Sequence, residues 1–155
     1  MFILPAFLLI CCGQNVSRIN AGNDDVYSSV PEQYRNSLRE TVERMIALRK
    51  TSRWELLFDL IDNQRGISKE QYILESKKLY KLIEFKPTNV AYYPPGDIWT
   101  IHGCAVFKPM PRKGDKAVYS VINARQSNDG WKLSDILIEV PKNPAETQPC
   151  SEGKD

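Results

Sequence analysis

The side chains in this sequence that could do chemistry are few and scattered. His102 is the single histidine of the chain, and Cys104 follows it at a spacing of two. Neighbours at this spacing point to the same side of a strand, but the spacing alone does not give a close contact between nucleophile and base. A metal site needs three or four converging ligands. We therefore interpret His102 as structural and predict no metal and no cofactor.

The acidic residues also lack a catalytic arrangement. Asp135, which flanks Trp131 on the last predicted strand, is interpreted as a surface or hydrogen-bonded structural residue. There is no glycine-rich phosphate loop, no serine nucleophile elbow and no paired-cysteine metal motif. The sequence therefore predicts no catalytic residue. The other aspartates fall in predicted turns or on the polar side of a helix: Asp97, Asp129, Asp59 and Asp62.

Large aromatic residues offer the main candidates for a ligand pocket. Aromatic side chains at helical or strand spacing usually fill a core, and a few of them can also line an apolar cavity. We favour core packing and keep the pocket as the second interpretation. The candidates are Trp54, Phe58, Trp99, Phe107, Tyr119 and Trp131.

The charge of the chain does not favour nucleic acid as a partner. Lysine and arginine number 21 against 19 aspartates and glutamates, a formal charge of +2. A field that weak does not attract a phosphate backbone. The densest basic cluster lies at 108–116, where interleaved proline and glycine are typical of a solvated hairpin connection.

The N-terminus has the character of an export segment. Residues 1–12 carry no charged side chain, and Phe2 to Ile10 is almost wholly apolar. This stretch is shorter than the roughly 20 residues that span a bilayer, but it fits the apolar region of a secretory signal. We predict a signal at 1–13 with cleavage after Gly13, or after Ala21, and a linker at 14–30. The mature protein would be exported, to a periplasm or to the cell exterior.

Two of the four cysteines lie inside this export segment. The residues before Cys11 and Cys12 resemble a bacterial lipoprotein processing site. That pattern has a small residue just before the cysteine, and here this position holds Ile10 or Cys11. Lipidation at Cys11 or Cys12 is therefore an alternative to simple export, and it is the single route by which we expect membrane attachment.

The other two cysteines, Cys104 and Cys150, would remain after cleavage. In an oxidising compartment they could pair across 46 residues, with a stabilisation of about 3 to 4 kcal/mol from loop closure. The other interpretation is a buried Cys104 and a free Cys150. We slightly favour the free thiol, because nothing in the sequence around Cys150 holds that tail still.

The folded domain is predicted at 31–140 and begins with three helices. Ser29, Ser52 and Ser68 each start a pattern of the capping-box type. Apolar residues then recur every three or four positions, which predicts helices at about 32–50, from 52 to about 63–66, and 68–79. The third should present its inner residues to the core: Tyr72, Ile73, Ser76 and Leu79.

From residue 82 the period changes to two, which predicts a sheet. Four strands are expected at about 82–92, 98–107, 116–125 and 131–140, the last two joined as a hairpin by Asp129-Gly130. On the second strand Trp99, Ile101, Ala105 and Phe107 share one face, which should face the helices. The last two strands are partly apolar on both faces, so they are either covered on both faces or form a homodimer contact. The polar tail at 141–155 is predicted to be disordered.

This order of elements resembles the nuclear-transport-factor-2-like superfamily, also called the SnoaL or ketosteroid-isomerase-like cone. The residues that carry the resemblance are 53–61, 66–72 and 129–135, and it covers about 31–140. It implies an α+β fold with three N-terminal helices packed on a curved four-stranded antiparallel sheet. It also implies a pocket at the wide end of the cone, which some members use for catalysis and many for binding.

The resemblance leaves several functions open, because fold does not settle function. The leading hypothesis is a non-enzymatic exported domain that binds a small apolar ligand or a protein partner. One alternative is a small-molecule isomerase, cyclase or hydrolase of the same fold, which would need a carboxylate base facing the pocket. Another is a lipid-anchored envelope protein. Cystatin-like protease inhibition is not expected, because Asn128 stands where that hairpin motif has valine.

Overall fold

The structure is a computed structural model that describes residues 25–139 and Cys150. The predicted export segment, the lipidation candidates Cys11 and Cys12, most of the linker and most of the tail lie outside these residues. Within the described part, none of the helices combines the length and the apolar character needed to cross a membrane. The elements are α1 (Glu32–Lys50), α2 (Trp54–Phe58), α3 (Lys69–Ser76), β1 (Lys81–Tyr93), the 3-10 turn η1 (Pro94–Gly96), β2 (Ile98–Lys108), β3 (Val118–Ser127), β4 (Gly130–Leu133) and β5 (Leu137–Ile138).

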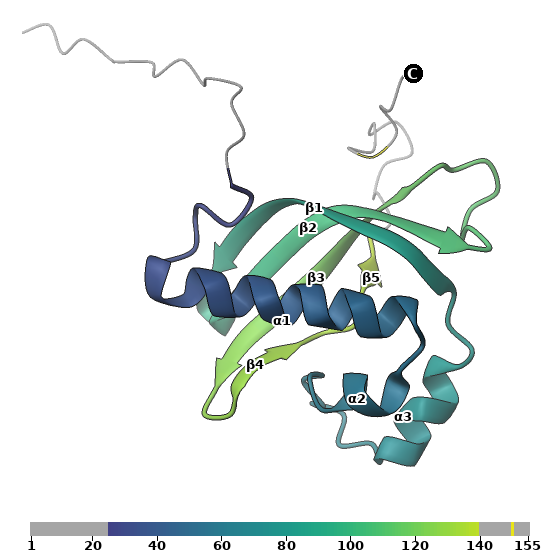
Figure 1. Ribbon diagram of the computed structural model, residues 1–155, viewed down its shortest axis with the longest axis horizontal. Helices are drawn as coiled ribbons and strands as arrows, with labels where there is room; N and C mark the ends of the chain where they lie inside the picture. The colour runs from purple at the N-terminus through teal and green to yellow at the C-terminus, as the bar shows by residue number, and fades with distance from the viewer. Residues whose placement is uncertain (1–24, 140–149, 151–155) are drawn as a thin grey trace, which may run out of the picture.

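The architecture is α+β, as predicted: three helices and an open antiparallel sheet. The strands follow one another in the order β1-β2-β3-β4, and β5 pairs with β3 beyond the end of β4. Figure 1 shows α1 lying across one face of the curved sheet, with α2 and α3 together beyond the C-terminal end of α1. The main core therefore lies between α1 and the sheet.

Helix α1 has the predicted bounds and the predicted apolar face. Leu38, Val42, Met45 and Arg49 are its buried residues, at spacings of three and four. The predicted capping box at its start is wrong, because the N-cap is Pro31 and no side chain caps the helix. The Ser29 hydroxyl instead donates a hydrogen bond to the Val90 carbonyl at 2.7 Å, which ties the chain entering α1 to strand β1.

Helix α2 is much shorter than predicted. The chain breaks after α1 as expected, with Ser52 at a φ of 56°, but no side chain caps α2, so the second capping box is also wrong. The backbone around Ile61 joins the sheet instead of continuing as a helix. The Leu133 N–H donates to the Leu60 carbonyl at 2.8 Å, and the Asp62 N–H donates to the Leu133 carbonyl at 2.8 Å.

Helix α3 begins as predicted and ends early. The Ser68 hydroxyl accepts a hydrogen bond from the Gln71 N–H at 3.2 Å, so the third capping box forms in part as expected. Tyr72 and Ser76 are buried. The helix ends at Ser76, and Leu79 is exposed, which corrects the prediction that it faces the core.

The face of β2 that was predicted to face the helices is the buried face in the structure. Ile101, Ala105 and Phe107 of β2 are buried, and Trp99 packs against the same core from a partly buried position. Strand β1 contains two irregularities in its pairing with β2, near Leu82 and near Pro87, and bulges of this kind bend a sheet. The α1-facing side of β2 is therefore the inner side of the curve.

The fourth predicted strand is two short strands with a break between them. At the break the Asn123 N–H donates to the Ser134 hydroxyl at 2.9 Å, in place of a backbone partner. The Ile136 N–H donates to the Asp135 carboxylate at 2.7 Å. The Ser134 N–H still donates to the Asn123 carbonyl at 2.7 Å, so the ladder is interrupted at 135–136 before β5 returns to β3.

A disulfide joins Cys104 on the outer face of β2 to Cys150, with 5.6 Å between the Cα atoms. This corrects the slight preference for a free Cys150. The sequence around Cys150 does lack other anchoring features, and the bond itself supplies the anchor. The homodimer hypothesis stays a prediction, although Val121 on the outer face of β3 is buried within this chain.

We expect Cys150→Ser to lower the free energy of unfolding by about 3 to 4 kcal/mol, because a link across 46 residues restricts the unfolded chain. Urea unfolding measures the loss. Reductant should destabilise the natural chain by a similar amount and leave the Cys104→Ser/Cys150→Ser double variant unchanged. Alkylation of Cys104 and Cys150 in folded, unreduced protein would contradict the disulfide.

Candidate functional site

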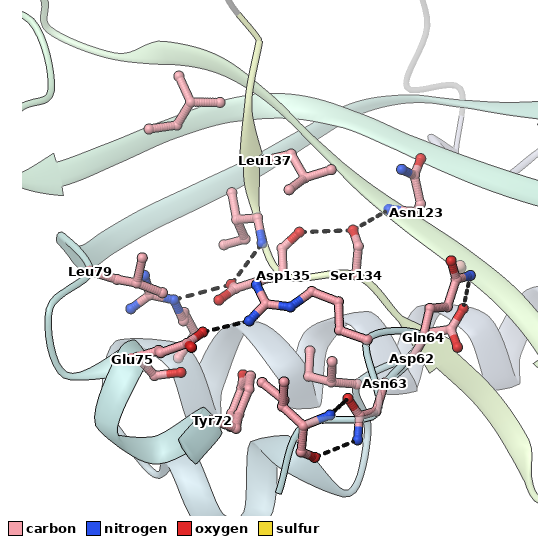
Figure 2. Close-up of a pocket in the computed structure, with 18 of the residues that line it drawn as sticks. Asp62, Asn63, Gln64, Tyr72, Glu75, Leu79, Asn123, Ser134, Asp135 and Leu137 are labelled. Atoms are coloured by element: carbon pink, nitrogen blue, oxygen red, sulfur yellow. Dashed lines mark hydrogen bonds and ion pairs between the residues drawn. The ribbon is translucent and has the colours of Figure 1, made fainter. Parts of the chain in front are cut away.

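The candidate site is a cavity of about 600 Å³ at the α3 end of the molecule. Figure 2 shows Tyr72 and Glu75 of α3 on one side of it, with Ser134 and Asp135 of the break in the last strand facing them. The 61–67 loop and the middle of β3 complete the wall. Much of the lining is apolar: Ile61, Ile67, Leu79, Ile98, Phe107, Ile136, Leu137 and Ile138.

Arg49 is the most deeply buried charged residue on this wall, with 3% of its surface exposed. Its Nε donates to the Asp135 carboxylate at 3.2 Å, and its Nη2 donates to the Tyr80 carbonyl at 3.0 Å. The guanidinium also lies over the Trp54 ring, 4.7 Å from its centre. These contacts fix the arginine head between α1, α2, the start of β1 and the break after β4.

Two donors on the wall remain without partners among the described residues. One is Nη1 of Arg49, and the other is the hydroxyl of Tyr72, whose side chain is 8% exposed. Burial, reinforced by the nearby Asp135 charge, raises the pKa of Tyr72 to about 12. Tyr72 therefore keeps its proton at neutral pH, and neither donor has an acceptor among the described residues.

The remaining charges of the wall are paired nearer the solvent. Arg65 Nη2 lies 2.7 Å from Glu75, and Arg125 Nη1 lies 3.3 Å from Asp62. Together with Arg49 and Asp135 these make three ion pairs among the residues that line the cavity. The wall therefore carries no net charge from its described residues.

Of the six aromatic pocket candidates, Phe107 lines the cavity and the other five do not. Trp54 and Trp131 are buried in the core, where Trp54 lies under Arg49 and the Trp131 ring nitrogen donates to the Ser37 hydroxyl. Phe58 packs on the Tyr72 ring at 5.4 Å between centres, so it supports a wall residue from behind. Core packing, the interpretation favoured from their spacing, accounts for these three.

The other two candidates lie elsewhere on the sheet. Trp99 packs against Tyr92, with 4.7 Å between ring centres. Tyr119 lies on the outer face of β3, where its ring stacks on His102 and its hydroxyl meets the histidine Nδ1. Partial burial lowers the pKa of His102. Cys104 is in the disulfide, so His102 has no thiolate to activate, and the described residues contain no group of side chains suited to a metal ion.

Sequence reasoning missed the three residues that define the polar part of the site. Arg49 falls in the apolar stripe of α1, and a charge at a core position is the signal that could have identified it. Tyr72 was expected to point toward a packed core, whereas in the structure it lines the cavity. Asp135 was interpreted as a surface or hydrogen-bonded residue. The structure shows it hydrogen-bonded to Arg49, a partner 86 positions away that no local pattern could indicate.

Comparisons with known proteins place this chain in no family. No family model, no curated protein and no solved structure matches it.

We expect Arg49→Met to lower the free energy of unfolding by about 2 to 4 kcal/mol, because it leaves Asp135 without its cation and the Tyr80 carbonyl without its donor. Arg65→Met is the matched control on the same wall. Its pair with Glu75 is exposed to solvent, so its loss should change stability little. Urea unfolding compares the two variants, and equal losses would contradict the role given to Arg49.

Proposed function

We propose that this chain is a non-enzymatic binding domain that takes a small, mainly apolar ligand in the cavity beside α3. The observation that carries the proposal is a cavity of about 600 Å³ with a largely apolar wall that also contains three internally paired arginines. Ligand sites commonly combine an apolar lining with a few placed polar groups. A small ligand is favoured over a protein partner because these apolar side chains line a cavity and not a flat surface.

The enzymatic alternative has less support from the same residues. An isomerase, cyclase or hydrolase would use a wall carboxylate as its base. Asp135 is the most enclosed carboxylate of the three, and it already accepts from Arg49 and from the Ile136 N–H. Asp62 and Glu75 are engaged by arginines as well. For Glu75, hydrogen bonds from Arg65 and Gln71 lower the pKa of the carboxyl group and weaken it as a base.

The nuclear-transport-factor-2-like class remains our proposal for the ancestry of the fold. Three helices before an antiparallel sheet, a curved inner face and a cavity between a helix and the sheet end support it. Export is proposed on the apolar N-terminal segment, and the Cys104–Cys150 disulfide supports it, because such bonds persist in oxidising compartments.

Mass spectrometry of the mature protein tests export directly. A first residue of Gln14, after cleavage behind Gly13, is the expected result, and a first residue of Gly22 would point to cleavage after Ala21. An acylated Cys11 or Cys12 would instead establish the lipid-anchored alternative. A chain that keeps Met1 and carries no lipid would overturn the predicted signal.

Binding of N-phenyl-1-naphthylamine, a neutral apolar dye whose fluorescence rises in apolar sites, tests the function. The natural chain should bind it, and Leu137→Asp should weaken binding about tenfold, because Leu137 lines the cavity. Leu74→Asp is the control, since Leu74 is an exposed leucine, at 61%, that lies off the cavity wall. Failure of the natural chain to bind the dye would overturn the proposal.

A further inference from the structure

A surface that is both basic and apolar lies at the end of the molecule where α3 leads into β1. We propose that this basic surface, formed by residues 74–83 and 108–113, docks the protein on a membrane rich in anionic phospholipid. The proposal goes beyond ligand binding and does not depend on it. It also differs from lipidation at Cys11 or Cys12, because it places the membrane contact on the folded domain.

The fold brings together two basic segments that are far apart in the sequence. Lys81 at the start of β1 is the Cα partner of Lys108 at the end of β2. Figure 1 shows the α3–β1 connection, the start of β1 and the loop between β2 and β3 along the same end of the molecule. Alone, the basic cluster of that loop is typical of a solvated turn, but here it is half of a larger field. The basic residues of the two segments are Lys77, Lys78, Lys81, Lys108, Arg112 and Lys113.

The charges of the basic surface are not balanced within the fold. None of its six basic residues forms an ion pair with another of the described residues. Glu75 is paired with Arg65, so the acidic residues left in or beside the surface are Glu84 and Asp115. Six cations against these two anions leave an excess of four positive charges, although the whole chain carries a formal charge of only +2.

The pair at the centre of the surface carries a cost in the folded protein. Lys81 and Lys108 are both exposed, and they stand directly opposite each other on the β1–β2 ladder. Like charges in this position destabilise a sheet. An acidic residue at either position would remove the repulsion, so the arrangement is better explained by an anionic partner than by stability.

Exposed apolar side chains lie within the same surface. They expose between 40% and 61% of their area, and they are four of the eight exposed large apolar residues in the described part of the chain: Leu74, Leu79, Tyr80 and Ile83. Half of that exposed apolar set therefore falls within ten consecutive positions. Exposed apolar residues gathered in this way mark an interaction surface.

The combination of lysine with exposed leucine and isoleucine favours a bilayer over another polyanion. A nucleic acid or an acidic protein would attract the lysines, but neither offers an apolar medium for Leu74 and Ile83. An anionic bilayer offers both, because its phosphates attract basic side chains and its acyl boundary accepts apolar ones. The lysine stems can also lie along the apolar boundary while their ammonium groups stay at the phosphates.

Cosedimentation of the full chain with lipid vesicles tests the proposal. The vesicles contain phosphatidylglycerol and phosphatidylcholine in equal parts, or phosphatidylcholine alone. We expect tighter binding to the anionic vesicles, and added salt should reduce the difference because it screens exposed charges. Lys81→Gln/Lys108→Gln should weaken binding to the anionic vesicles about twenty- to thirtyfold, since each basic residue near such a surface contributes about fivefold.

The matched control for charge is Arg44→Gln/Lys86→Gln. It removes the same charge from two exposed residues, one on α1 and one in the middle of β1, and should change vesicle binding little. Lys81→Gln/Lys108→Gln should unfold at the same urea concentration as the natural chain or a slightly higher one, because it relieves a like-charge pair. A loss of vesicle binding in that variant then cannot arise from unfolding.

The apolar part of the surface has its own matched pair of variants. Leu74→Gln should weaken binding to the anionic vesicles, because Leu74 lies one helical turn before Lys77 and Lys78 and is 61% exposed. Tyr93→Gln should not, because Tyr93, at 59% exposed, lies at the other end of β1. Equal binding by these two variants would overturn the bilayer assignment.

The remaining outcomes separate docking from ligand binding. Equal binding of the natural chain to the two kinds of vesicle, or equal losses in the two charge variants, would overturn the proposal. Tighter binding to double-stranded DNA than to the anionic vesicles would overturn it in favour of a nucleic acid. Lys81 and Lys108 do not line the cavity, so their double variant should bind N-phenyl-1-naphthylamine as the natural chain does. Either proposal can therefore fail while the other stands.

Discussion

The burial of the Arg49 guanidinium is the constraint on which this structure depends. Arg49 contacts Asp135 and the Tyr80 carbonyl, which lie 86 and 31 positions away in the chain, and the Trp54 ring at the start of the next helix. A buried cation is costly unless it is paired and hydrogen-bonded. The end of α1, the start of α2, the approach to β1 and the break after β4 must therefore meet at one point.

Pairing with Asp135 fixes Arg49 but does not use all of its donors. Nε and Nη2 are engaged within the chain, while Nη1 finds no acceptor among the described residues. A domain built for stability alone could have placed an apolar side chain at this position, as buried ion pairs are often no better than well-packed hydrophobic residues.

Local sequence patterns predicted most of the elements and faces of this fold. The bounds of α1 follow from its apolar period, the Ser68 cap sets the start of α3, and the alternation on β2 identifies its inner face. The capping box at Ser29 did not form for a tertiary reason, because its hydroxyl donates to the Val90 carbonyl, 61 positions away. The box at Ser52 did not form either, since no side chain caps α2. The pairing of Cys104 with Cys150 likewise depends on a contact that no local pattern records.

The three places where an element ends earlier than its pattern predicts all lie on the cavity wall. Helix α2 stops at Phe58, and the 61–67 loop that replaces its last turns forms one side. Helix α3 ends at Ser76, and Leu79 and Tyr80 after it line a second side of the cavity. The last strand breaks at 134–136, which presents Asp135 to Arg49. Apolar periodicity reflects the local preference of the chain for a helix or a strand. A prediction from periodicity therefore continues each element past the residue where tertiary contacts end it. The same interruptions that a single sequence cannot predict are the ones that open the site.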